Sequence, residues 1–362
     1  MKKKINIWVF VWIIIFTLYF FMAARPISQE TVLIPRWLNS TESENLILLD
    51  NNSVNKDNFL IPFDLENRFG YISNNGNFFV NKIKEKNISL SEDRWAEYEA
   101  EPDKIIVYGN DGDVLAVIDN PGAYPFFLDG RIFLINSEQN AVSEIDSLGF
   151  ILWNHEFASV ITCVDAASGL FLCGSIDGTI YVLDKNGNQI FSFKPGGSRI
   201  SVITGCAISG DGRKIAVISG VDRQRFLFIE SDRYGSNYKV VYHEYLEEGF
   251  RRPVHVEFIE NDQWVIFERK EGLGFYKTGS GKTEIVKLEG KITALDNCGG
   301  DGQVFAIISL DDDLKKLIEI KLPDRIILNA PFKSDGTFLS RKGSRLIIGG
   351  GQKLIAFDID KN

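Results

Sequence analysis

Cysteine and histidine most often bind metals or act as nucleophiles, and this chain has four cysteines and three histidines. Cys163 and Cys173 flank the expected turn at residues 168–169 about symmetrically. A cross-strand disulfide between them is one alternative outside the cytoplasm, and two buried free thiols are the alternative we favour. Their spacing is not that of a zinc site. His243 and His255 lie in no cysteine or carboxylate pattern that indicates a metal site or a catalytic triad.

Two other motifs resemble ligand-binding loops but lack the residues that define them. Residues 279–283 have the ending of a phosphate-binding loop, yet Tyr276 stands where the first glycine is required and a strand pattern follows in place of a helix. Residues 311–313 lack the alternating oxygen ligands and the distal Glu of a calcium loop. The sequence therefore predicts no cofactor, no metal site and no catalytic residue. An alternative enzyme or small-molecule sensor would use acids such as Asp165 or Asp296 on expected inner strands.

The charge of the chain makes nucleic acid a poor partner. The formal net charge is −9 at pH 7, and the first 25 residues contain four basic residues and no acidic one. The remainder is thus more acidic than the whole and repels a phosphate backbone at long range. Since no Lys/Arg run beyond the N-terminus compensates, we expect no nucleic-acid binding.

The N-terminal segment predicts a membrane anchor. Residues 5–24 are uncharged and lie between the lysines at positions 2–4 and Arg25. About 20 apolar residues match the thickness of a bilayer core. The lysines should stay in the cytoplasm, which places the remainder on the periplasmic side of the cytoplasmic membrane. A cleaved signal peptide is the alternative. We expect an anchor over residues 1–24, a tether over 25–44 and one domain over 45–362.

The rest of the chain predicts a repeated four-stranded unit of roughly 40 residues. The clearest unit has strands at 160–165, 170–175, 179–184 and 189–193, with Gly-containing turns between them. Related strands recur along the chain, and no amphipathic helix is evident downstream of the anchor. Because one such sheet cannot cover both of its faces, radial packing of several sheets is favoured. The sequence therefore predicts an all-β fold, a β-propeller of four-stranded blades.

The spacing of the repeats also predicts the number of blades and how the ring closes. Eight blades are preferred, but the 27-residue interval from Asp119 to Asp146 is short for four strands, so seven is the alternative. The last unit lacks a fourth strand, and residues 45–50 form an orphan strand pattern near the start of the domain. We expect this orphan strand to complete the last blade.

A recurring string joins Asp, a turn Gly three residues on and an aromatic four residues later. It occurs as Asp119, Gly122 and Phe126; as Asp146, Gly149 and Trp153; and as Asp184, Gly187 and Phe191. With residues 178–184, this resembles the PQQ-like (quinoprotein-type) propeller repeat, and WD40-like propellers are the neighbouring family. The resemblance implies the fold more than an activity, and the missing Cys-Cys pair implies the non-enzymatic branch. We expect the aromatic residues to be wedges between blades.

These features predict a membrane-tethered scaffold for protein interaction or envelope assembly, with an envelope protein or a cell-wall polymer as partner. Aromatic and arginine side chains on loops are typical of binding hot spots. The candidates, in two long insertions, are Arg233, Tyr234, Tyr245, Phe250, Arg251 and Arg252. The alternative is a propeller enzyme or small-molecule sensor that uses the central channel.

Overall fold

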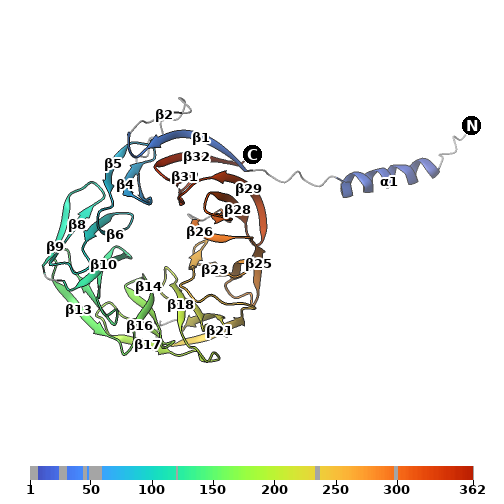
Figure 1. Ribbon diagram of the computed structural model, residues 1–362. Helices are drawn as coiled ribbons and strands as arrows, with labels where there is room; N and C mark the ends of the chain where they lie inside the picture. The colour runs from blue at the N-terminus through green and yellow to red at the C-terminus, as the bar shows by residue number, and fades with distance from the viewer. Residues whose placement is uncertain are drawn as a thin grey trace, which may run out of the picture.

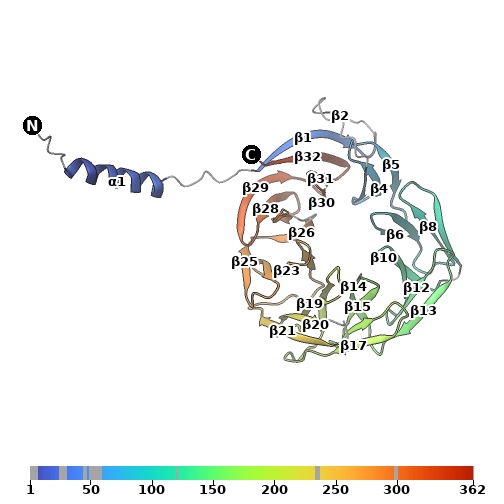
Figure 2. The ribbon, with the colours of Figure 1, turned by 180° about the vertical axis from the view of Figure 1, so that it is seen from behind.

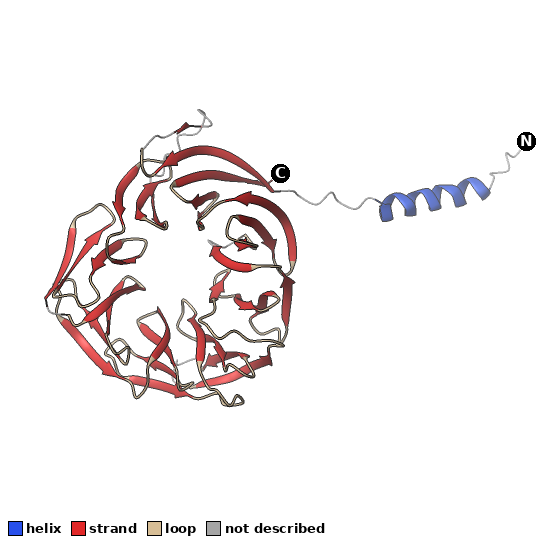
Figure 3. Ribbon diagram, in the orientation of Figure 1, coloured by secondary structure: helices blue, strands red, loops and turns tan. Residues whose placement is uncertain are grey.

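The computed structural model describes residues 7–23, 31–43, 47–48, 59–119, 121–232, 237–296 and 301–361. After one N-terminal helix the described chain consists of strands and turns (Figure 3). The strands form eight antiparallel sheets around a central axis, each with its first strand innermost (Figure 1). The predicted all-β propeller is confirmed, with the preferred count of eight blades.

The first four blades follow the chain in simple meander order. Blade 1 contains β3 (Leu60–Asp64), β4 (Arg68–Ser73) and β5 (Phe78–Ile83). Blade 2 contains β6 (Asn87–Leu90), β7 (Arg94–Tyr98), β8 (Lys104–Gly109) and β9 (Val114–Asp119). Blade 3 contains β10 (Ala123–Leu128), β11 (Arg131–Asn136), β12 (Ala141–Ile145) and β13 (Ile151–Glu156). Blade 4 contains β14 (Ile161–Ala167), β15 (Leu170–Ser175), β16 (Ile180–Leu183) and β17 (Gln189–Phe193).

The last four blades include the one that joins the two ends of the described chain. Blade 5 contains β18 (Ile203–Ile208), β19 (Lys214–Ser219), β20 (Arg225–Ser231) and β21 (Tyr238–Tyr245). Blade 6 contains β22 (Val256–Ile259), β23 (Trp264–Arg269), β24 (Gly272–Lys277) and β25 (Thr283–Lys287). Blade 7 contains β26 (Lys291–Asp296), β27 (Gln303–Ser309), β28 (Leu314–Lys321) and β29 (Arg325–Lys333). Blade 8 contains β30 (Phe338–Lys342), β31 (Arg345–Gly350), β32 (Lys353–Lys361), β1 (Thr31–Ser40) and the short β2 (Ile47–Leu48).

The middle strands of a blade are apolar on both faces because both faces are covered. Successive side chains of a strand point to opposite faces. In β15, Phe171 and Cys173 pack in the cluster shared with blade 3, whereas Leu172 packs in the cluster shared with blade 5. All three are fully buried. The hydrophobic core is therefore a ring of separate clusters between neighbouring blades, and each blade depends on the next for burial.

Two of the three predicted aromatic wedges lie where the repeat places them. Trp153 is buried between blades 3 and 4, and its indole lies against the backbone of the turn at Gly187, where a Cβ atom would clash with it. Phe191 packs against Tyr238 of blade 5 with ring centroids 5.0 Å apart. Phe126 does not follow the prediction, because its side chain is 37% exposed on the first strand of blade 3.

The closing strand differs from the one expected at residues 45–50. β1 pairs with β32 from Thr31–Lys361 to Ser40–Lys353 and takes the outer position of blade 8 (Figure 2). It lies within the range expected as a tether, so the propeller includes residues from Thr31 onward. Of residues 45–50 the structure describes Ile47–Leu48, which pair with the outer edge of β1 as β2. β1 suits the closing position because it supplies Trp37, which is 1% exposed and donates a 2.8 Å hydrogen bond to the carbonyl of Asn74 in blade 1.

The short interval from Asp119 to Asp146 reflects a different strand assignment and not a missing blade. Asp119 ends β9, the fourth strand of blade 2, whereas Asp146 directly follows β12, the third strand of blade 3. The interval is short for a blade only if both residues end equivalent strands, and they do not. Blade 1 has three strands among the described residues, and the chain passes from β5 directly to the inner strand of blade 2. These two features together produce the irregular spacing.

The helix α1 covers Ile7–Ala23. Among the described residues, no helix has the combination of length and hydropathy that a membrane span requires.

Candidate functional site

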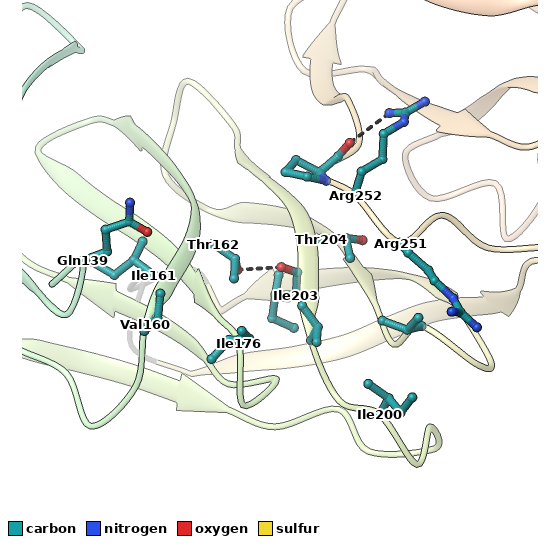
Figure 4. A pocket seen from close by; sticks show the side chains of 13 residues that line it. Gln139, Val160, Ile161, Thr162, Ile176, Ile200, Ile203, Thr204, Arg251 and Arg252 are labelled. Atoms are coloured by element: carbon teal, nitrogen blue, oxygen red, sulfur yellow. Dashed lines mark hydrogen bonds between the residues drawn. The ribbon is translucent and has the colours of Figure 1, made fainter. Parts of the chain in front are cut away.

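An apolar pocket of about 550 Å³ opens among the loops at one face of the propeller (Figure 4). Its walls come from two kinds of loop, namely those that precede the first strands of blades 4, 5 and 6, and the turns between the second and third strands of blades 3, 4 and 5. The lining residues are scattered in the sequence between Gln139 and Pro253, and they meet here because the ring places these loops side by side. The volume is that of pockets that bind ligands.

The floor and walls of the pocket consist mainly of aliphatic side chains. Val160, Ile176 and Ile200 are 37%, 51% and 53% exposed. Ile203 and Ile161, which also line it, are buried and continue into the core between blades. Burying an aliphatic side chain that is exposed stabilises a complex by about 1.5–3 kcal/mol at full burial. The pocket therefore offers apolar surface whose burial favours binding.

Five backbone hydrogen bonds connect these loops with one another and with the neighbouring strands. Each loop that precedes a first strand is bonded to a neighbouring turn or strand start. The N–H groups of Ile161, Ile176, Gly220, Val221 and Val254 donate to the carbonyls of Gln139, Val160, Val202, Ile200 and Thr204, at 2.7, 2.9, 2.8, 3.2 and 2.9 Å. We call this bonded set the loop layer. Since its amides are satisfied, a ligand gains from side-chain burial and not from new backbone hydrogen bonds on the floor.

Gln224 holds three parts of the loop layer together. Its side chain is 1% exposed, and its amide nitrogen donates to Thr204 Oγ1 at 3.2 Å and to the carbonyls of Gly220 and Phe250, both at 3.3 Å. Its amide oxygen accepts the N–H of Phe250 at 3.1 Å. A buried amide whose groups are all bonded fixes the positions of its partners. Gln224 thus ties the loop before blade 6 to blade 5.

An ion pair between Arg252 and Glu268 also holds the loop before blade 6 in place. The guanidinium donates two hydrogen bonds to the carboxylate, Nη2 to Oε1 at 2.5 Å and Nη1 to Oε2 at 2.9 Å. Glu268 is 1% exposed, and this pairing raises the pKa of Arg252. The guanidinium also lies 4.2 Å from the ring centre of Phe250. Arg252 is therefore a positioning residue, and Figure 4 shows it directed away from the floor.

Asp222 organises the loop that carries Ile200. Its carboxylate accepts hydrogen bonds from the Ser198 hydroxyl and from the backbone N–H groups of Arg199 and Ile200, at 3.1 and 3.2 Å for the two amides. The Ser198 hydroxyl and the Ile200 amide hold the pKa of Asp222 well below its usual range. This carboxylate therefore fixes Ile200 at the pocket.

The polar side chains at the two ends of the pocket differ from the floor. Gln139 lies at one end and Arg251 at the other (Figure 4). Both are exposed, and within the described part of the chain no hydrogen bond or ion pair to either side chain is found. Among the described lining residues there is no Asp or Glu. Arg251 therefore gives this part of an acidic protein a local positive charge.

The predicted hot-spot residues separate into three groups. Arg251 and Arg252 line the pocket, and Phe250 supports its wall. Tyr245 lies apart from the pocket, beneath the guanidinium of Arg223 at 4.8 Å. Arg233 and Tyr234 lie outside the described residues.

The disulfide considered between Cys163 and Cys173 is absent, and both thiols are free. Because Cys163 pairs with Gly174 and Cys173 pairs with Val164, the two cysteines point to opposite faces of blade 4. Cys163 instead lies near Cys206 of blade 5. The hydrogen bond with Cys163, together with burial, raises the pKa of Cys206, and burial raises the pKa of Cys173.

The two inner-strand acids bond across blade boundaries. Asp165 accepts the N–H of Ile208 in blade 5 at 2.8 Å, and Asp296 accepts the N–H of Arg341 in blade 8 at 2.8 Å. Burial raises the pKa of Asp165 to about 6. Over the ranges that the structure describes, no three His, Cys, Asp or Glu side chains are grouped to hold a metal ion.

Several residues of the pocket were not predicted from the sequence. In the sequence nothing distinguishes Ile176, Ile200 and Val160 from ordinary residues at strand ends, or Gln224 from an ordinary polar turn residue. The signal for Ile176 is its place in a turn, directly before Asp177-Gly178, where a large aliphatic side chain is unusual.

Comparison with known proteins agrees with this architecture. A protein of Treponema pallidum (strain Nichols), named "Uncharacterized protein", is 28% identical over 285 residues, which cover 76% of this chain and 74% of that protein. The crystal structure of BamB from Moraxella catarrhalis has a TM-score of 0.57 at 13% identity and covers 90% of this chain and 98% of that one. The computationally designed Ika8 protein has a TM-score of 0.60 at 16% identity and covers 84% and 98%.

A chain in the crystal structure of the mitotic checkpoint complex has a TM-score of 0.53 at 13% identity, and covers 86% of this chain and 96% of that one. At these identities the structural likeness shows the fold. The resemblance to PQQ-like and WD40-like propeller repeats is confirmed. The beta-propeller protein family model matches residues 1–362, and the chain therefore belongs to the beta-propeller protein family.

Proposed function

We propose that this protein is an interaction scaffold that docks a protein partner in the apolar pocket of its loop face. The observation that carries the proposal is the exposure of Val160, Ile176 and Ile200 on loops that the backbone hydrogen bonds of the loop layer hold in place. Such a surface is rigid before binding, so association orders few groups. Concave, preformed sites lined mainly by hydrophobic side chains are typical of binding pockets.

We further propose that the scaffold works on the periplasmic side of the cytoplasmic membrane, held there by its N-terminal segment. This part of the proposal rests on the sequence, since residues 5–24 are uncharged and follow three lysines. For the docked partner it predicts a protein of the cell envelope. Alkaline phosphatase fused after residue 362 tests the side of the membrane. Activity of the fusion supports the periplasmic location, and an inactive but stable fusion contradicts it.

The proposed role requires no catalysis. The acids that a channel enzyme would use, Asp165 and Asp296, accept backbone N–H groups of the next blade. They thereby contribute to the joints between blades. Turnover of a small molecule by the purified protein, abolished by Asp165→Asn, would favour an enzyme instead.

Site-specific photocrosslinking in cells tests the docking proposal directly. A photoreactive phenylalanine analogue replaces Ile176 or Ile200 in the pocket, and in matched controls it replaces Leu148 or Ile151. The control side chains are 72% and 63% exposed on the outer rim of blade 3. We expect a discrete protein adduct from the pocket positions only. Equal adducts from all four positions, or adducts from the controls alone, would contradict docking in the pocket.

A further inference from the structure

The pocket is elongated, with an apolar floor and a different polar side chain at each end, and this arrangement restricts which ligands can bind. It extends from Gln139 in blade 3, past the aliphatic floor of blades 4 and 5, to Arg251 before blade 6 (Figure 4). The floor is apolar, and the one lining cation that is not committed to an ion pair is Arg251, among the residues that the structure describes. A matching ligand is apolar along its length and carries negative charge at one end.

The positive charge at that end is not cancelled within the loop layer. Arg252 is paired with Glu268, whose carboxylate is buried. Asp222, the acid on the neighbouring turn, is bonded to Ser198 and to the Arg199 and Ile200 amides. Its remaining contact is an ion pair with the Arg199 guanidinium at 3.3 Å. An incoming carboxylate therefore meets Arg251 without an internal competitor on the pocket wall.

The other end offers amide recognition. Gln139 holds the turn with its backbone, whose carbonyl accepts the N–H of Ile161, and its side-chain amide is exposed. A side-chain amide both donates and accepts, as does a peptide group. A long, apolar floor with an amide at one end and a guanidinium at the other complements an extended peptide better than a compact molecule.

We propose that the partner presents an extended segment in which two or more aliphatic or aromatic residues are followed by Asp or Glu. The apolar side chains occupy the floor at Ile176 and Ile200, and the carboxylate pairs with Arg251. This inference rests on the proposed docking function and specifies the chemistry of the partner. The net charge of −9 repels an acidic segment at long range, and Arg251 favours its carboxylate at this end of the pocket.

Selection from a displayed library of random dodecapeptides tests the inference whatever the identity of the natural partner. The full-length protein is the bait, and Ile176→Ser/Ile200→Ser is the counter-selection bait. We expect enriched peptides with clustered Leu, Ile, Val or Phe beside Asp or Glu. Enrichment of basic or uniformly polar peptides, or no enrichment that the counter-selection removes, would overturn the inference.

The best enriched peptide, labelled with fluorescein, then measures the role of charge by fluorescence anisotropy. Arg251→Gln should weaken binding about fivefold, the value of an exposed ion pair of about 1 kcal/mol. The same change should leave a peptide with Asn in place of Asp unaffected. Arg199→Gln, in an exposed pair on the neighbouring loop, is the matched control and should alter binding less than twofold. Equal losses for the Asp and Asn peptides would overturn the assignment of Arg251.

The outcomes separate this inference from the docking proposal. Photocrosslinks at Ile176 and Ile200 without acidic–apolar enrichment would retain the docking function and reject the peptide chemistry. Binding of a fluorescent fatty acid, displaced by no selected peptide, would reject the peptide in favour of a lipid anion. If the pocket positions yield neither crosslinks nor enriched peptides, both proposals fail.

Discussion

Replacing Arg252 by Met tests whether a buried ion pair holds the wall of the pocket. Glu268 is 1% exposed, and Arg252 donates to it two hydrogen bonds of 2.5 and 2.9 Å. The Met side chain keeps much of the apolar stem of Arg252 over Phe250 and removes the charge. The change therefore leaves a buried carboxylate without its main partner.

The size of the effect follows from the burial of the two partners. Removing one member of a buried pair costs about 3–5 kcal/mol. Because the Arg252 side chain is 38% exposed, water screens part of the interaction, and we expect a loss of about 2–3 kcal/mol. Replacing both Arg252 and Glu268 by Met removes the stranded charge. The double variant should lose only about 1 kcal/mol of unfolding free energy, which is less than the loss in Arg252→Met alone.

Urea unfolding followed by circular dichroism and tryptophan fluorescence measures these losses, and coincident transitions verify two-state behaviour. The matched control is Arg199→Met, because the Arg199 side chain is 92% exposed and pairs with Asp222. We expect the control to lose no more than about 0.5 kcal/mol. If Arg252→Met loses no more than the control, or if the double variant loses at least as much as Arg252→Met alone, the ion pair does not hold the wall.

Three further predictions concern other parts of the ring. Trp37→Phe removes the indole hydrogen bond and should lower the free energy of unfolding by about 1 kcal/mol, whereas Trp37→Ala also removes the packing and should lower it by about 4 kcal/mol. Equal losses in urea unfolding would contradict this division. Because the folded-state pKa of Asp165 is raised to about 6, its ionisation opposes folding. The wild type should then lose on the order of 2–3 kcal/mol relative to Asp165→Asn as the pH rises from about 4 to 7, and a constant difference would refute this. Cys173 and Cys206 should resist iodoacetamide in the folded protein and react once it is unfolded, because their raised pKa values disfavour the thiolate; labelling of either in the native state, measured by mass spectrometry, would contradict their burial.

The meander within each blade was predictable because it is encoded locally. Apolar runs separated by Gly-containing turns specify hairpins, and blade 4 has its strands within one or two residues of the expected ranges. The position of a strand within its blade was harder to predict. Asp119 ends a fourth strand, whose local pattern is the same as that of a third strand. The choice between 31–40 and 45–50 as the closing strand also depends on contacts with β32, far away in the sequence, which no local pattern reports.

The site was predictable only in part. Arg251, Arg252 and Phe250 stood out because arginine and aromatic side chains on loops are typical of binding hot spots. Ile176 and Ile200 could not be recognised, since an exposed isoleucine and a core isoleucine look the same in a sequence. Their role arises from the ring, which brings together loops that are distant along the chain.

The pairing of β1 with β32 makes the order of synthesis matter. A ribosome releases Thr31–Ser40 long before Lys353–Lys361, so β1 waits on the order of half a minute for its partner at ordinary elongation rates. During that time its hydrogen-bonding edge and Trp37 must be shielded by a chaperone or by the neighbouring blade 1. A chain that stops short of β32 never completes the circle and leaves an open edge at each end of the stack. Closure therefore distinguishes chains that contain β32 from chains that end before it. The feature that differs is an unpaired strand edge, which a protease can bind whatever its side chains are.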